Sequence, residues 1–282
     1  MMGPMVAVID AHTHVASEDE ARHPRRLGGF GSAWHASGGH GVENLLATMN
    51  AAGVERAVVV QAVGVYGEDH SCAIDAVAAA PDRLALVVAP GMHDDPLGAV
   101  TALVQQAPIA GVRLFGVDRR PLDWLTDGRA GELFDLARAE RWTLVPTLFP
   151  DALDALGTIA AAHPDVPVAL DHCGFPDLDG GPPFRGAGAL FALAGVPNVH
   201  LKISTHLLED AQRSADPAAL VDLLAERFGG ARLCWGSDHP QSEALDYPAK
   251  LAFARRAARH LPTADHDALF AKTSSRLWFG ES

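Results

Sequence analysis

The sequence predicts an α/β protein, a (β/α)8 TIM barrel that forms a single domain over residues 1–282, and three observations predict it. Eight short apolar segments recur along the chain, segments of helical spacing separate them, and the length of 282 residues suits eight such units. At 48% hydrophobic residues, the chain also has enough apolar material for one large core. An open doubly wound sheet is the alternative, but the first apolar segment lacks the glycine-rich fingerprint that usually follows it there.

The predicted strands are almost continuous runs of Val, Leu, Ile and Ala, which is typical of parallel strands covered on both faces. They lie at residues 6–9, 57–63, 84–89, 111–115, 143–148, 166–171, 199–204 and 232–235. Helices are expected between them, for example at residues 72–80, 131–140, 152–162 and 218–228. The last of these has Asp216-Pro217 before it and Gly229-Gly230 after it, which are helix start and stop signals.

Composition limits the partners and the compartment. A formal net charge of −13 argues against nucleic acid and anionic membrane surfaces, and leaves a small-molecule substrate. Three widely spaced cysteines, Cys72, Cys173 and Cys234, favour a reducing compartment over a disulfide framework. The N-terminus has no basic region of a signal peptide, and no apolar run reaches the roughly 18 residues of a membrane span. We therefore expect a cytoplasmic protein, and a homo-oligomer is compatible with the sequence.

The most informative motif is Asp10-Ala11-His12-Thr13-His14, directly after the first apolar run. Side chains alternate along a strand, so Asp10, His12 and His14 are expected on one face. Two imidazoles projected together from a rigid strand suit a divalent metal or a polarised substrate oxygen. The alternative interpretation is a pair of partly exposed histidines where the strand meets its loop.

Other polar residues recur where the predicted strands end, and in a barrel the reactive groups lie at the C-terminal ends of the strands. They are Gln61, Arg113, Thr147, His172, Lys202 and Ser204 on the second, fourth, fifth, sixth and seventh strands, and Asp238 and His239 after the eighth. We expect these side chains to converge with His12 and His14 on one cavity, which His206 is also near enough to reach.

Residues 18–41 form an unusually long connection after the first strand. Arg22, Arg25, Arg26, Trp34 and His35 make it a candidate lid or substrate clamp, and a mobile solvated loop is the alternative.

Three motifs, in this order, resemble the amidohydrolase superfamily: residues 10–14, Leu170-Asp171-His172-Cys173-Gly174 and Trp235-Gly236-Ser237-Asp238-His239-Pro240. The resemblance is to the amidohydrolase-related (amidohydrolase 2) branch, which contains 2-pyrone-4,6-dicarboxylate lactonase and the sugar lactonases. It covers nearly the whole chain, because residues 275–280 also resemble the C-terminal helix of that branch.

The resemblance implies a lactonase-type hydrolase of a small carboxylate-bearing cyclic ester. By that resemblance Asp238 activates the water, while His12, His14 and His172 polarise the carbonyl directly or through one divalent metal. Arg113 matches an arginine that binds the substrate carboxylate. The remaining expected substrate contacts are Lys202, Ser204, Thr147 and Gln61, although Gln61 is equally interpretable as a packed amide.

Metal dependence is left open by the sequence. Metal-dependent relatives usually place a further histidine or a carboxylated lysine on the fourth or fifth strand, where this chain has Arg113 and Thr147. A binuclear centre is therefore not expected. A single zinc or manganese ion on His12, His14, His172 and Asp238 remains one hypothesis, and metal-free action is the other.

Three other functions compete with hydrolysis. A metal-dependent non-oxidative decarboxylase of an aromatic or unsaturated acid would use the same aspartate, but its relatives carry a fifth-strand histidine. A Schiff-base enzyme would use Lys202 as nucleophile and leave the paired histidines without a role. A non-catalytic binding module predicts that Asp238→Asn changes no activity.

Overall fold

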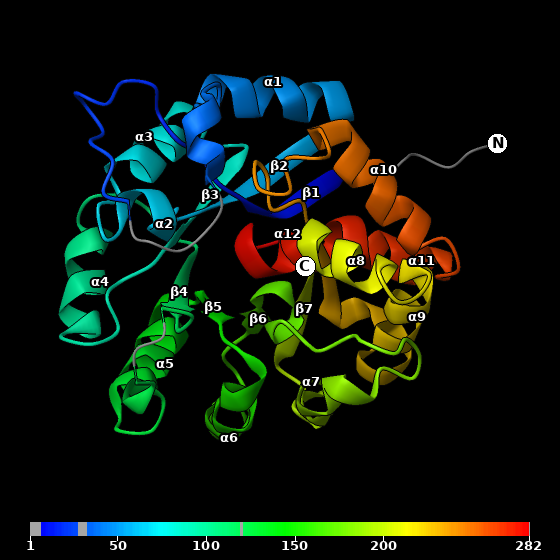
Figure 1. Ribbon diagram of the computed structural model, residues 1–282. Helices are drawn as coiled ribbons and strands as arrows, with labels where there is room; N and C mark the ends of the chain where they lie inside the picture. Colours follow the sequence, from blue (N-terminus) through cyan, green and yellow to red (C-terminus); the bar gives the residue numbers. More distant parts are fainter. Residues whose placement is uncertain (1–6, 28–32, 119–120, 282) are drawn as a thin grey trace.

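The computed structural model describes residues 7–27, 33–118 and 121–281 of the chain. Its strands form one sheet of eight, paired in parallel in the order of the sequence, with helices around the outside (Figure 1). The strands are β1 Val8–Thr13, β2 Val54–Val60, β3 Leu84–Val88, β4 Gly111–Phe115, β5 Thr143–Thr147, β6 Val168–Leu170, β7 Val199–Ser204 and β8 Leu233–Gly236. Each overlaps one predicted segment, so the predicted (β/α)8 barrel is confirmed.

Most helices lie in the connections between successive strands and around the outside of the sheet, whereas the last one covers the N-terminal ends of the strands. They are α1 Val42–Ala52, α2 Val63–Tyr66, α3 Ser71–Ala79, α4 Pro96–Val104, α5 Arg129–Glu140, α6 Leu153–Ala162, α7 Gly188–Ala192, α8 Thr205–Gln212, α9 Pro217–Phe228, α10 Tyr247–Ala257, α11 Thr263–Asp267 and α12 Thr273–Trp278. The four predicted helices correspond to α3, α5, α6 and α9, with ends displaced by one or two residues. The start of α9 follows its predicted signal, because the Asp216 carboxylate accepts the Ala218 amide at 3.0 Å.

Three strands, β1, β2 and β6, differ from their predicted bounds by two or more residues at an end. β2 lies at Val54–Val60, three residues before the predicted 57–63. β1 runs on to Thr13 because its polar side chains find partners inside the barrel: Thr13 donates to the Val58 carbonyl at 2.9 Å, and Asp10 accepts the Ser237 amide at 2.8 Å. The predicted position 6 lies outside the described residues. β6 is shorter, because the chain turns at once into the 3-10 segment η4 Asp171–Gly174.

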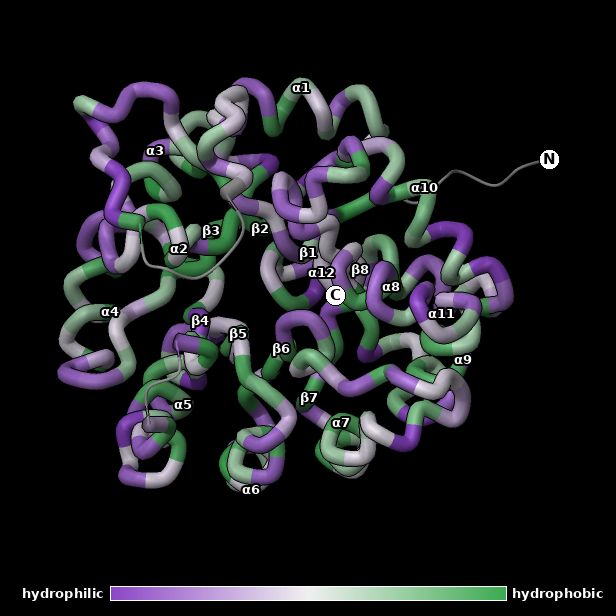
Figure 2. The backbone as a smooth tube through the Cα atoms, in the orientation of Figure 1, coloured by the Kyte–Doolittle hydropathy of each residue, from purple (hydrophilic) through white to green (hydrophobic). Residues whose placement is uncertain are grey.

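The barrel interior is apolar at its base. Small and branched side chains of the strands form an inner cluster with Leu277 and Trp278 of α12. The Thr143 hydroxyl, at the start of β5, donates to the Leu277 carbonyl at 2.7 Å, so α12 covers the N-terminal ends of the strands. In Figure 2 the strands are predominantly hydrophobic, whereas hydrophilic residues concentrate on the outer helices and loops.

The barrel closes where β8 meets β1. The Asp238 amide donates to the His12 carbonyl at 2.9 Å, and the His14 amide donates to the His239 carbonyl at 2.7 Å. Gly236 allows this approach, since a Cβ there would lie 2.7 Å from the Cβ of His12. Among the described residues, no helix combines the length and the apolarity that crossing a bilayer requires.

We expect Gly236→Ala to destabilise the protein by about 1–3 kcal/mol, because the new methyl group overpacks the contact between β8 and β1. Urea unfolding followed by circular dichroism measures this loss. The matched control is Gly131→Ala in α5, where an added Cβ has no heavy atom within 4 Å. An equal effect of the two substitutions would contradict the role assigned to Gly236.

Candidate active site

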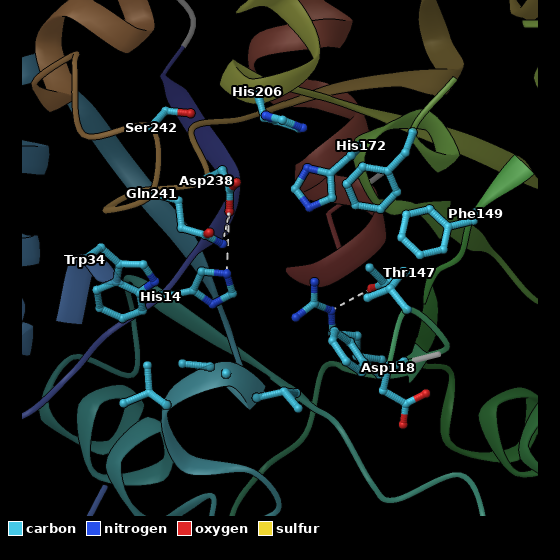
Figure 3. Close-up of a pocket in the computed structure, with 18 of the residues that line it drawn as sticks. His14, Trp34, Asp118, Thr147, Phe149, His172, His206, Asp238, Gln241 and Ser242 are labelled. Atoms are coloured by element: carbon cyan, nitrogen blue, oxygen red, sulfur yellow. Dashed lines mark hydrogen bonds and ion pairs between the residues drawn. The ribbon is translucent and has the colours of Figure 1, made fainter. Parts of the chain in front are cut away.

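A cavity of about 860 Å³ opens at the C-terminal ends of the strands. Figure 3 shows its residues projecting inward from the surrounding segments, with His14 and Asp238 on one side and His172 and Thr147 on the other. The lining residues are His14, Trp34, Ala62, Val63, Gly64, Val65, Arg113, Phe115, Val117, Asp118, Thr147, Phe149, His172, Phe175, His206, Glu209, Asp238, Gln241 and Ser242. The expected convergence of distant segments on one cavity therefore holds for five predicted residues: His14, Arg113, Thr147, His172 and Asp238.

The paired histidines of β1 meet the aspartate that follows β8. His12 Nε2 and His14 Nε2 lie 3.2 Å apart, and they lie 3.6 Å and 3.5 Å from Asp238 Oδ1. Each ring is held through its other nitrogen, because His12 Nδ1 donates to Asp171 at 3.0 Å and His14 Nδ1 donates to the Val60 carbonyl at 2.8 Å. The Nε2 atoms of both rings thus face the Asp238 carboxylate.

Asp171 lies beneath this group and is fully buried. Its Oδ1 accepts from Lys202 Nζ at 3.0 Å as well as from His12, and its Oδ2 accepts from Arg113 Nε at 3.0 Å and from the Thr147 hydroxyl at 2.7 Å. Asp171 belongs to the second family motif, but no role was predicted for it. Its position immediately before His172 was the available signal.

His172 and Asp238 share an unusual backbone. Both are non-glycine residues with left-handed φ values, 52° and 54°. Such conformations cost of order 1–3 kcal/mol each and concentrate at functional sites, where the surrounding fold enforces them. The His172 ring is further fixed by the Ser204 hydroxyl, 2.9 Å from its Nδ1, which also accepts the Leu207 amide at the start of α8.

The electrostatics keep the two carboxylates ionised, and burial lowers the pKa values of His12 and His172. Burial alone would raise the pKa of Asp238, but His172 and a hydrogen bond with His14 outweigh it, and the pKa falls below its ordinary value. The pKa of Asp171 is also well below its ordinary value, because Lys202, His12 and Arg113 outweigh the effect of burial. Burial lowers the pKa of His12 to about 3, so this ring is neutral near pH 7.

Five of the residues expected at the cavity are not among those that line it: Gln61, Lys202, Ser204, His12 and His239. The Gln61 amide donates to the carbonyls of Gly67 and Asp69, at 2.8 Å and 3.0 Å. Lys202 is fully buried against Asp171, and Ser204 lies behind His172. His12 lies behind three lining residues, His14, Asp238 and His172, and contacts each of them.

From its described residues, the long connection after β1 contributes Trp34 to the cavity. Trp34, in the 3-10 segment η1 Ala33–Ser37, stacks on His14 with ring centroids 6.2 Å apart. The predicted clamp arginines instead form ion pairs outside the cavity: Arg22 with Asp75, Arg25 with Glu20 and Arg26 with Asp69. Residues 28–32 of this connection lie outside the described residues.

Several lining residues were missed by sequence reasoning. Phe115 is the last residue of β4, Asp118 and Phe149 follow β4 and β5 by a few residues, and Phe175 follows η4. Glu209 of α8 and Gln241 and Ser242 after β8 form another part of the rim. Extending the search a few residues past each strand would have found most of them. His206, which the sequence placed within reach, does line the cavity.

The amidohydrolase family model matches residues 9–280, and the chain therefore belongs to the amidohydrolase family of enzymes. The chain is 30% identical over 262 residues to L-fucono-1,5-lactonase of Burkholderia ambifaria, which covers 88% of this chain and 87% of that one. It is 27% identical over 210 residues to 4-sulfomuconolactone hydrolase of Rhizobium radiobacter, covering 73% and 68% of the two chains. A solved structure of a candidate 2-pyrone-4,6-dicarboxylic acid hydrolase from Pseudomonas putida is 25% identical, with a TM-score of 0.76 and coverage of 99% and 100%. The family expected from the three motifs is thus confirmed.

We expect Lys202→Met to lower the free energy of unfolding by about 3 kcal/mol near neutral pH, because it removes one cation from a buried carboxylate. The pKa of Asp171 lies well below its ordinary 3.8, so its stabilisation is present above that value and is lost as the pH falls toward the folded pKa. Without Lys202 the folded pKa rises, and the acid loss of stability begins at a higher pH.

Urea unfolding at a series of pH values between about 3 and 7 measures both effects. The matched control is Lys272→Met, which removes a lysine paired with Asp267 at 3.0 Å on the surface, where its side chain is 60% exposed. Its expected effect is within about 0.5 kcal/mol. If the stability of Lys202→Met fell at the same acidic pH as that of the wild type, the role given to this ion pair would be contradicted.

Proposed function

We propose that this enzyme hydrolyses a small carboxylate-bearing cyclic ester, and that Asp238 activates the attacking water. The observation that supports this best is the position of the Asp238 carboxylate, which is buried beside two histidine nitrogens yet faces the cavity. Two similar proteins are named for lactone hydrolysis, and a third, known from its structure, is named for hydrolysis of a pyrone dicarboxylic acid. These names support the same reaction class.

In the proposed reaction, Asp238 accepts a proton from water as the water oxygen attacks the carbonyl carbon of the lactone. The bond between that carbon and the ring oxygen then breaks, and the Asp238 carboxyl returns the proton to the leaving oxygen. The product is the open-chain hydroxy acid. His172, which contacts Ser204 through Nδ1, has Nε2 left to stabilise the negative charge that develops on the carbonyl oxygen.

Arg113 is proposed to bind the substrate carboxylate, with Thr147 beside it. Within the described part of the chain, Arg113 is the one lysine or arginine that lines the cavity. Its Nε is fixed by Asp171 and by the Thr147 hydroxyl, at 3.0 Å and 2.7 Å, which orients the guanidinium edge. A guanidinium held in this way offers paired donors to a carboxylate.

Lys202, Ser204 and Gln61, expected as substrate contacts, are proposed instead to position other groups. Lys202 holds Asp171, Ser204 holds the ring of His172, and Gln61 ties the segment after α2 to the end of β2. Each of these polar side chains forms a hydrogen bond or ion pair with a polar group inside the protein. A buried polar group left without such a partner would cost more free energy than the loss of a contact at the surface.

The donor set fits a single divalent cation. Ligand atoms of His12, His14 and Asp238 lie within 4.8 Å of one another, and a second such group contains His12, Asp171 and His172. Two imidazole nitrogens and a carboxylate oxygen facing one another are all electron-pair donors, which suits zinc or manganese. A bound ion would supply Lewis-acid polarisation of the substrate carbonyl, with His172 as a further candidate ligand. Direct hydrogen bonding by the histidines is the metal-free alternative.

Geometry favours hydrolysis over the competing functions. The end of β5 carries Thr147, which bonds to Asp171, where a decarboxylase of this family would carry a histidine. Lys202 is enclosed between Asp171 and the Trp278 ring, which lies 5.0 Å from its Nζ, so it is poorly placed for a Schiff base. Neither feature conflicts with ester hydrolysis.

We expect Asp238→Asn to lower kcat for lactone opening by about 10³-fold, because an amide does not accept the proton of the water. Release of acid from L-fucono-1,5-lactone, 4-sulfomuconolactone, 2-pyrone-4,6-dicarboxylate and δ-valerolactone, each with and without added zinc or manganese, measures the activity. The control is Asp222→Asn, which alters an aspartate paired with His260 on the outer helix α9. Full activity of Asp238→Asn toward a lactone that the wild type hydrolyses would refute the assigned base.

We expect protein purified without chelators to carry about one zinc or manganese ion per chain, and His12→Ala or His14→Ala to lower that content, since each removes a nitrogen ligand. Elemental analysis measures the content independently of activity. Turnover before and after removal of the ion by a chelator then separates the two hypotheses. Undiminished turnover of ion-free enzyme would establish the metal-free route.

A further inference from the structure

One sector of the cavity is lined by phenylalanines that the hydrolysis of a lactone ring does not use. Phe115 ends β4, Phe149 lies two residues beyond the end of β5, and Phe175 follows the η4 turn after β6. Because β4, β5 and β6 are neighbours in the sheet, these three rings occupy adjacent positions around the mouth of the barrel. Phe149 and Phe175 are in contact, with ring centroids 5.4 Å apart.

Phe149 is the most informative of the three, because its side chain is 41% exposed. In the described residues, the large hydrophobic side chains that are exposed are Phe149 and Leu27, and only Phe149 belongs to the cavity. A phenylalanine held open to solvent inside a concave site is typical of a surface that a ligand covers.

This apolar surface leads directly to the reacting groups. Phe175 packs against His172 with ring centroids 4.9 Å apart, so the rings continue from Phe149 to a histidine of the proposed site. Figure 3 shows Phe149 beside His172 and Thr147, across the cavity from Trp34. A group attached to a lactone ring near His172 would therefore reach Phe149 without leaving the cavity.

The opposite sector, beyond β7 and β8, is polar. Glu209 and Ser242 line it and are joined by a hydrogen bond of 2.8 Å, with His206 and Gln241 next to them. The cavity thus has a polar side after β7 and β8 and an aromatic side after β5 and β6. Its volume of about 860 Å³ far exceeds what one lactone ring fills, and lies in the upper part of the roughly 300–1,000 Å³ range of pockets for larger ligands.

We propose that the substrate is a lactone with an apolar substituent, an aryl or alkyl group, which binds against Phe149 and Phe175. This inference rests on the proposed lactone hydrolysis and names its substrate class more narrowly. The substituent covers the exposed ring of Phe149. Because this apolar contact is made away from the reacting carbonyl, it contributes to substrate binding more than to the chemical step. Selectivity for the substituent is therefore expected mainly in KM.

The test compares δ-valerolactones that carry a methyl or a phenyl group on the carbon bonded to the ring oxygen. For the wild type, kcat/KM for the phenyl compound is expected to exceed that for the methyl compound at least about tenfold. Phe149→Ala is expected to reduce this ratio about tenfold, mainly through KM. Because Phe149 is partly exposed, this variant is expected to fold, and its thermal unfolding is measured alongside.

The matched control is Phe191→Ala, which removes a ring on α7 that contacts Arg227 outside the cavity, and it is expected to leave the ratio unchanged. A non-hydrolysable ether, 2-phenyltetrahydropyran, tests the subsite without turnover: its Kd, measured by calorimetry, is expected to rise about tenfold in Phe149→Ala and to stay the same in Phe191→Ala.

The outcomes separate the two proposals. If the wild type hydrolyses lactones but shows no preference for the phenyl compound, or if Phe149→Ala lowers both rates equally, the apolar subsite is refuted and lactone hydrolysis stands. If neither these two compounds nor the four lactones of the Asp238→Asn experiment are hydrolysed, the proposed function fails, and weaker binding of the ether to Phe149→Ala than to the wild type still supports the subsite.

Discussion

The interaction on which the site depends is the buried ion cluster around Asp171. A carboxylate without solvent is tolerated only when its oxygens are fully hydrogen-bonded and its charge is balanced. Here Lys202 and Arg113 supply the charge, from β7 and β4, while His12 and Thr147 complete the hydrogen bonds. The same contacts fix the ring of His12 and the guanidinium of Arg113. The Asp171 carboxylate therefore both joins the strands and orients side chains of the proposed site.

A second constraint is the closure of the barrel beside the proposed base. The main chain that carries Asp238 is hydrogen-bonded to the main chain that carries His12 and His14, and the small size of Gly236 permits their approach. The distance between the aspartate and the two histidines is therefore set by the backbone. The left-handed conformations of His172 and Asp238 are enforced by the same rigid frame.

The two halves of the cavity mouth have different chemistry. Strands β5 and β6 are followed by the aromatic rings of Phe149 and Phe175, whereas the segments after β7 and β8 contribute Glu209, Gln241 and Ser242. In a barrel the loops vary independently of the strands that carry the reacting groups. The residues at the strand ends are thus those that identify the family of this enzyme. The residues just beyond the strand ends are those expected to set its substrate preference.

The sequence by itself determined the barrel and the candidate reactive side chains. Continuous apolar runs report burial on both faces, which is a local property, and motifs such as residues 10–14 fall at strand ends that the same pattern locates. Only the tertiary structure decided which polar residues face the cavity and which support their neighbours. Lys202 and Arg113 are both cations on predicted strands, yet one is enclosed beneath Asp171 and the other lines the cavity. That difference arises because side chains from strands far apart in the sequence lie at the same level inside the barrel. The residue pattern along a single strand does not predict which of them will be neighbours.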